Sequence, residues 1–164
     1  FPDPFRDCSS LEREKNGIYG DKAEVFYTHV IKKYPFPEFE GEKFLTEAVV
    51  WDRIAYDGLK IRWINEIIYL CEYQQDGLSA NWDKNLANNP EGYALWLKQK
   101  MEFRPCYGFE RFLSVYGYYY TINLEKKYSM KYACDKLGYP LLKAYFYMPI
   151  RKAKRIYSRL KGID

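Results

Sequence analysis

The sequence has few of the residues from which metal sites, disulfide frameworks and membrane spans are built. Its 164 residues include one histidine, His29, and four widely spaced cysteines that form no Cys-x-x-Cys pair. This spacing disfavours a structural zinc site and is typical of reduced thiols in a cytosolic protein. No apolar run approaches the roughly 18 residues of a membrane span, and the first residues have no apolar signal region. We therefore expect a cytoplasmic protein that is soluble or bound peripherally to a membrane.

Acidic residues are missing from the end of the chain. Residues 136–163 contain eight Lys or Arg and no Asp or Glu, although the net charge of the whole chain is only +4. The tail up to Asp164 therefore carries +7 and residues 1–135 carry −3. Opposite charges in the two parts suggest two different roles.

Aromatic residues are abundant. They make up 20% of the chain, with 18 Tyr and 10 Phe, so there is enough apolar surface for a folded core. This composition is not that of a disordered chain. The length fits one compact domain, or one domain with a small appendage.

Local patterns in the first half predict short strands around one helix. Residues 21–27 alternate polar and apolar side chains, which predicts a strand. Residues 60–65 and 67–73 are rich in Ile, Trp and Tyr and predict two further strands. Residues 40–55 predict a helix that ends near Asp57-Gly58. Residues 1–19 have little periodicity and are expected to form a surface segment with one helical turn.

The second half has a helical pattern. We expect helices at 90–103, 107–124 and 129–137, the third capped by Ser129 and closed by Gly138. A last helix is expected at 139–161, kinked or split at Pro149. The predicted fold is therefore mixed α/β and predominantly helical.

Glu47 is the first candidate for chemistry. On the wheel of the expected 40–55 helix, Val50, Trp51 and Ile54 bracket Glu47, whereas Thr46 and Arg53 share the opposite side. A carboxylate among apolar neighbours has a raised pKa, as suits a general acid or base. The alternative is that Glu47 forms a salt bridge or reaches water.

Three segments together resemble family 2 glycosyltransferases with the A-type fold. They are 20–26 (Gly-Asp-Lys-Ala-Glu-Val-Phe), 33–47 (Lys-Tyr-Pro-Phe-Pro-Glu-Phe-Glu-Gly-Glu-Lys-Phe-Leu-Thr-Glu) and 64–73 (Ile-Asn-Glu-Ile-Ile-Tyr-Leu-Cys-Glu-Tyr). The resemblance covers about residues 1–100, with 20–51 its most specific part, and points to bacterial enzymes that build capsule or cell-wall polysaccharides. It implies that 1–80 form the C-terminal, acceptor-side half of a transferase domain with a short mixed sheet, followed by a helical region at 81–164.

The resemblance also implies a role for the Glu47 helix. In the family an acid on this helix removes a proton from the acceptor hydroxyl during an inverting displacement, and Glu47 occupies its position. The family commonly has Asp after that acid, whereas Ala48 follows here. Trp51 and Asp52 of the same helix are then expected to contact substrate. Asp52 can alternatively pair with Arg53 or Arg62.

Two further residues are assigned by the resemblance alone. Asp21 and Lys22 occupy positions that family members place near the donor sugar and the acceptor. The alternative for this pair is an exposed salt bridge in a turn.

The donor side of such an enzyme is missing from the sequence. The family binds its nucleotide-sugar through an Asp-x-Asp motif and a divalent Mg or Mn ion, and no Asp-x-Asp occurs here. We therefore expect no cofactor in this chain and no activity without a nucleotide-binding half. An exposed sheet edge is expected to pair with that missing half or with a second copy of the chain.

The basic tail suggests a surface partner. Residues 139–161 mix apolar and cationic side chains, which fits a helix bound to an anionic membrane surface on its cytoplasmic side. The alternative is a solvated face of a helix packed on its neighbours. Residues 129–147 also match a helix-turn-helix, but the second helix offers apolar rather than base-reading side chains.

The sequence therefore predicts the acceptor-side portion of an inverting glycosyltransferase that moves a sugar from a nucleotide-sugar to a glycan or lipid-linked acceptor. The alternative is a noncatalytic interaction or assembly domain derived from a transferase, and a nucleic-acid binder is the third reading.

Overall fold

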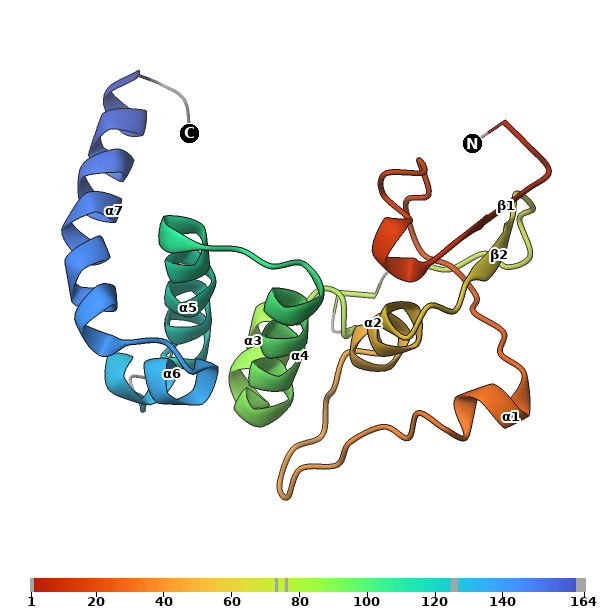
Figure 1. The fold of residues 1–164 in the computed structure, drawn as a ribbon, viewed down its shortest axis with the longest axis horizontal. Coiled ribbons are helices and arrows are strands. Elements are labelled where there is room, and N and C mark those ends of the chain that lie inside the picture. The colour runs from red at the N-terminus through yellow and green to blue at the C-terminus, as the bar shows by residue number, and fades with distance from the viewer. Residues whose placement is uncertain (1, 73, 76, 125–126, 162–164) are drawn as a thin grey trace.

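A computed structural model describes residues 2–72, 74, 75, 77–124 and 127–161, without the side chains of 154–161. About half of the chain is helical, and the one sheet in the described residues has two antiparallel strands. In Figure 1 the elements form a row, with the strands and α2 at one end, α3 and α4 in the middle, and α5 to α7 at the other end. The expected mixed, mainly helical class is confirmed.

The sheet pairs the start of the chain with a later strand. β1 (Phe5–Cys8) lies antiparallel to β2 (Ile61–Ile64), with Cys8 opposite Ile61. A 3-10 turn, η1 (Ser10–Glu12), follows β1 as expected. The indole Nε1 of Trp63 donates to the backbone oxygen of Cys8 at 3.1 Å and ties the strands together inside a small core.

Three predictions about the sheet are wrong. β1 falls in a segment expected to be irregular, and its partner strand is 53 residues away, so local periodicity could not reveal it. Residues 21–27 and 67–72 are not paired into any sheet, so two of the three expected strands do not form there. Tyr73, the end of the second expected strand, lies outside the described residues. The expected mixed sheet is therefore a two-stranded antiparallel one.

The helix expected at 40–55 begins later. After the short α1 (Thr28–Ile31), the chain remains irregular through Thr46, and α2 spans Ala48–Tyr56. Its end at Asp57-Gly58 is confirmed, and Gly58 has the positive φ of 90° that closes a helix. Val49, Val50 and Ile54 form the buried face of α2.

The irregular segment before α2 is anchored to the helical part. The side-chain oxygen of Asn89 accepts from the backbone amides of Lys43 and Phe44 at 2.6 and 3.0 Å. Both carboxylate oxygens of Glu42 accept from backbone amides at the start of α4. Asn89 thus binds the amides of Lys43 and Phe44 outside any helix, and Glu42 caps α4, so 42–44 are held in an irregular conformation before α2.

The remaining helices follow the sequence prediction closely, except α3, which was not predicted as a separate helix. They are α3 (Trp82–Asn88), α4 (Pro90–Phe103), α5 (Gly108–Ile122), α6 (Met130–Leu137) and α7 (Leu141–Lys161). The Ser129 hydroxyl accepts from the Tyr132 amide, and Gly138 ends α6 in the left-handed region with φ of 61°, as predicted. α7 continues through Pro149 as one helix, so the expected split does not occur.

The main core lies among α4, α5, α6 and α7. Phe112, Val115 and Tyr118 of α5 are fully buried and pack against Leu97 of α4 and Ala144 of α7. The hydroxyl of Tyr118 donates to the backbone oxygen of Pro90 at 3.1 Å and ties α5 to the start of α4. Among the described residues, no helix is both long enough and apolar enough to cross a membrane.

Candidate functional site

The extended segment 21–27 turns apolar side chains toward solvent. Its side chains alternate in exposure, with Lys22, Glu24 and Phe26 turned partly inward. The side chains turned outward include Val25 and Tyr27, which are 88% and 78% exposed. An amphipathic strand normally buries its apolar side. The inverted arrangement marks the outer side as a surface suited to cover by another layer of protein.

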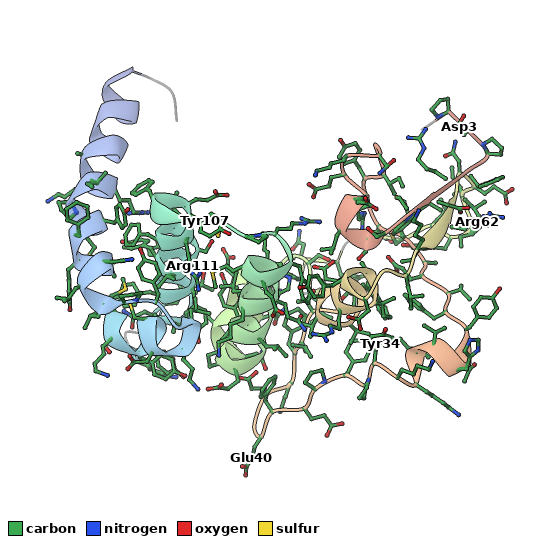
Figure 2. All side chains as sticks on the ribbon, in the orientation of Figure 1. Asp3, Tyr34, Glu40, Arg62, Tyr107 and Arg111 are labelled. Atoms are coloured by element: carbon green, nitrogen blue, oxygen red, sulfur yellow. The ribbon has the colours of Figure 1, made fainter. Side chains whose placement is uncertain are left out.

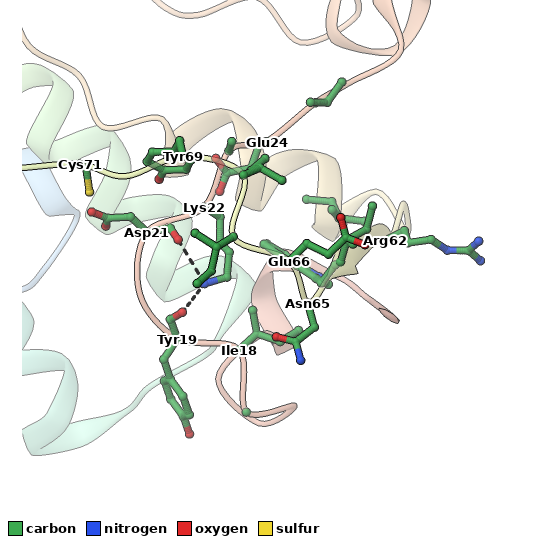
Figure 3. A pocket seen from close by; sticks show the side chains of 18 residues that line it. Ile18, Tyr19, Asp21, Lys22, Glu24, Arg62, Asn65, Glu66, Tyr69 and Cys71 are labelled. Atoms are coloured by element: carbon green, nitrogen blue, oxygen red, sulfur yellow. Dashed lines mark hydrogen bonds between the residues drawn. The ribbon is translucent and has the colours of Figure 1, made fainter. Parts of the chain in front are cut away.

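An open cavity of about 600 Å³ lies beside this segment. Its walls come from 17–25 on one side and from 61–71 on the other (Figure 3). Polar walls are supplied by Asp21, Lys22 and Glu24, with Tyr69 and Cys71 facing them from the second segment. The second segment also exposes a run of apolar side chains, Ile67, Ile68 and Leu70. The cavity therefore combines charged walls with an uncovered apolar margin.

Lys22 is held in place by the backbone. Its Nζ donates to the carbonyl oxygen of Tyr19 and, at 3.2 Å, to that of Asp21, as the dashed lines in Figure 3 mark. The preceding loop is in turn fixed by Arg13, whose guanidinium donates to the carbonyl oxygens of Ile18 and Gly20. Asp21 and Lys22 both line the cavity.

Glu24 is the carboxylate with the most perturbed surroundings in this cavity. Burial raises its pKa, and the nearby charge of Glu47 raises it further, whereas Arg13 and Lys22 act in the opposite direction. Glu24 and Glu47 therefore lie within electrostatic reach of each other, although 23 residues separate them. A pair of neighbouring carboxylates is an arrangement that suits proton transfer.

The expectation that Glu47 points into an apolar pocket is wrong. Glu47 immediately precedes α2, and its side chain is exposed. Its backbone oxygen accepts the first helical hydrogen bonds, from Val50 and Trp51. The wheel also failed for Thr46, which is 6% exposed, because Thr46 precedes α2 and has no place on its wheel. Arg53 is on the exposed side, as expected.

Trp51 links α2 to the cavity segment. Its ring lies 4.4 Å from that of Phe26 and 5.7 Å from that of Phe36. Its indole Nε1 is buried and has no hydrogen-bond partner. This packing holds 21–27 against α2 and so keeps Glu24 near Glu47.

Asp52 lies on another side of α2. Its carboxylate accepts from the Ser10 hydroxyl at 3.2 Å, and burial raises its pKa. The two arginines considered as partners pair elsewhere, Arg53 with Asp57 and Arg62 with Asp7. Asp52 therefore connects α2 to η1 and is not among the residues that line the 600 Å³ cavity.

Sequence reasoning did not single out Glu24. It occurs in the motif Gly20–Phe26 that carries the resemblance, two residues after Lys22, and strand alternation places the two side chains on one face. That spacing was the available signal. The inward direction of the face was not predictable, because it depends on the packing of Phe26 against Trp51.

No metal centre is formed within the described ranges. There, no group of three or more His, Cys, Asp or Glu side chains is arranged to hold a metal ion. The Mg or Mn ion implied by the resemblance therefore has no ligand set in that part of the chain.

Comparison with known proteins adds no relative. No protein-family model, no curated protein and no solved structure matches this chain significantly.

Proposed function

We propose that this chain supplies the acceptor side of an inverting glycosyltransferase, with Glu47 as the general base. The observation that carries the proposal is that Glu24, which lines a cavity with an apolar and uncovered margin, lies within electrostatic reach of Glu47. The motif around these residues is also the part of the sequence that most resembles family 2 enzymes. The donor sugar, its nucleotide and the acceptor are not specified by these residues.

In the proposed reaction an acceptor hydroxyl attacks the anomeric carbon of a nucleotide-sugar. The new bond joins the acceptor oxygen to that carbon, and the bond from the carbon to the nucleotide phosphate oxygen breaks. Glu47 takes the proton of the hydroxyl, and the nucleotide leaves with the bonding electrons. Lys22 and Glu24 line the cavity and can position sugar hydroxyl groups by hydrogen bonds.

The exposure of Glu47 fits this proposal if another layer covers the site during catalysis. A carboxylate in water is a weak base at its ordinary pKa, whereas exclusion of water strengthens its interaction with the proton. The outward apolar side chains Val25, Ile67 and Leu70 offer the surface on which a nucleotide-binding half would pack. The base would then become functional only in the assembled enzyme.

The test is a Glu47→Gln substitution in the reading frame that contains this chain together with a nucleotide-binding half. We expect sugar transfer to fall about 100-fold to 10,000-fold, with donor affinity unchanged. Glu40→Gln is the matched control, because Glu40 lies exposed on the loop before α2 (Figure 2). Equal turnover of the Glu47→Gln enzyme and the control would rule out the base assignment.

A second candidate is an assembly domain without catalysis. The same uncovered apolar surface favours it, because such a surface binds a protein partner whether or not chemistry follows. Val25→Ser would weaken partner binding under both proposals, whereas Glu47→Gln would affect only the enzyme. A helix-turn-helix role has less support, since α7 turns Leu142 and Phe146 toward solvent where base-reading polar side chains are needed.

A further inference from the structure

A second cavity, of about 450 Å³, lies between the start of α5 and the start of α7. Arg111 belongs to α5, and Tyr107 is the residue before this helix; both are labelled in Figure 2. The side chains that matter for binding are cationic or aromatic: Tyr107, Arg111, Tyr139, Lys143, Phe146 and Tyr147. The described residues that line the cavity include no carboxylate. The cavity is thus positive and aromatic.

Two buried polar atoms at this cavity have no hydrogen-bond partner. They are the Nε of Arg111 and the hydroxyl oxygen of Tyr139. Tyr139 is only 8% exposed, and Arg111 lies near enough to influence its ionisation. Buried donors without partners cost stability and are rare in folded proteins. Both residues line the cavity, so a small rotation of each side chain would present its donor to the acceptor oxygens of a ligand.

The charge of the cavity selects an anion. Arg111 and Lys143 approach it from different helices, and no lining carboxylate offsets them. Gly108 places the first turn of α5 at its wall, where the positive end of the helix dipole favours negative charge. Oxygen-rich anions such as phosphate match planar guanidinium and hydroxyl donors together.

The rim of the cavity continues into an apolar stripe on α7. Leu142, Phe146, Pro149 and Ala153 follow one another at helical spacing and are all exposed, Leu142 by 85% and Phe146 by 66%. The opposite side of the helix, with Ala144, packs on the core. Lys143 and Lys152 flank the stripe. An uncovered apolar stripe between cations is typical of helices that lie in a membrane interface.

We propose that this cavity binds the phosphate of an anionic lipid head group, with Leu142 and Phe146 inserted into the adjoining apolar layer. Charge complementarity supports a membrane as the occupant, since residues 136–163 contain eight basic residues and no acidic ones. This proposal does not depend on whether the chain takes part in glycosyl transfer. It explains the unpaired donors and the uncovered stripe with one ligand.

The test is co-sedimentation of the full chain with vesicles at low salt. One arm uses phosphatidylcholine alone, and the other adds phosphatidylglycerol. We expect binding to the anionic vesicles only. Arg111→Gln and Lys143→Gln should each weaken it about five-fold, the factor that corresponds to about 1 kcal/mol per cation. Tyr139→Phe, which removes only the unpaired hydroxyl, should weaken binding without lowering the melting temperature.

Matched controls distinguish binding by the cavity from the effect of removing any exposed cation or any exposed apolar side chain. Lys98→Gln removes an exposed cation of α4, and Leu78→Ser removes an exposed apolar side chain outside α7. Both should bind as the unmodified chain does, whereas Phe146→Ser should bind less. Circular dichroism melting of every variant shows whether a loss of binding reflects unfolding.

Three results would overturn the proposal. Equal binding to phosphatidylcholine vesicles would contradict the choice of an anionic head group, because phosphatidylcholine carries a phosphate but no net charge. Binding that depends on Lys154 and Arg155 but not on Arg111 or Tyr139 would assign it to diffuse attraction by the tail. Inorganic phosphate that raises the melting temperature at millimolar concentration, with no vesicle binding, would identify a site for soluble anions.

Discussion

The backbone amide of Gly92 donates to the Oε2 of Glu42 at 2.8 Å, across 50 residues of sequence. The other oxygen of Glu42 accepts from the amide of Glu91 at 2.6 Å. One carboxylate thus caps the first turn of α4, where helix amides have no partner within the helix. Because Glu42 precedes α2 by only a few residues, this cap also fixes where Glu47 lies.

Removal of this cap should destabilise the fold. We expect Glu42→Ala to lower the free energy of unfolding by about 1–2 kcal/mol, the usual cost of losing an N-terminal helix cap. Urea denaturation followed by circular dichroism measures the change. Glu40→Ala, on the exposed tip of the same loop, should change stability by less than about 0.5 kcal/mol. Equal losses in the two variants would contradict the capping role.

Gly92 should not tolerate alanine. A Cβ there would lie 2.9 Å from the Cδ1 of Leu45 and 3.2 Å from the Oε2 of Glu42. The overpacking costs about 1–3 kcal/mol, which exceeds the gain of about 1 kcal/mol in helix propensity. Gly117→Ala on α5 is the matched control, since its Cβ would meet no atom within 4 Å. Thermal melting should show a loss for the first variant and a gain for the second.

Glu47→Gln should change the titration of Glu24. Burial is the main cause of the raised pKa of Glu24, and the charge of Glu47 adds to it. Neutralising Glu47 should therefore lower the pKa of Glu24 without returning it to its ordinary value. Carbon-13 NMR of the side-chain carboxyl measures this, and Glu40→Gln should leave the titration unchanged. An unaltered titration of Glu24 in Glu47→Gln would show that the two carboxylates do not interact.

Replacement of Asp52 should change the free energy of unfolding by an amount that depends on pH. Burial raises its pKa, so the folded state binds its proton more tightly than the unfolded state does. This group's contribution to stability therefore falls as pH rises from its ordinary pKa to its folded one. Asp52→Asn should increase the free energy of unfolding at pH 7, and the gain should vanish below the ordinary pKa.

Urea denaturation at both pH values checks this prediction. Glu102→Gln, at an exposed position of α4, should show no such difference between pH values. A loss of stability in Asp52→Asn at pH 7 would mean that the Ser10 hydrogen bond requires the charged form.

The helical half could be predicted because its signals are local. Pro90 at the start of α4, Ser129 before α6 and Gly138 after it act within one turn of the helix ends that they define. The sheet could not be predicted in the same way, since β1 and β2 are defined by each other and by Trp63. The alternative of a split at Pro149 was wrong, since α7 continues through this exposed position as one helix.

The candidate site was only partly predictable. The motif that contains Asp21 and Lys22 was identified, and the structure places both at one cavity. The direction of the Glu47 side chain could not be predicted, because it depends on contacts of Asn89 and Glu42 that hold the chain irregular before α2. The cavity of Arg111 and Tyr139 was missed altogether, because its two walls are distant in sequence and their unpaired atoms exist only in the folded chain.

The position of Cys71 makes the first cavity accessible to a spectroscopic label once Cys106, which is also partly exposed, has been replaced. Cys71 is exposed at the cavity wall, whereas Cys8 and Cys134 are buried and burial raises the pKa of both thiols. A thiol-directed fluorophore should therefore react at Cys71 ahead of those two. Its emission would report in real time when a protein layer or a sugar displaces water from the surroundings of Glu24.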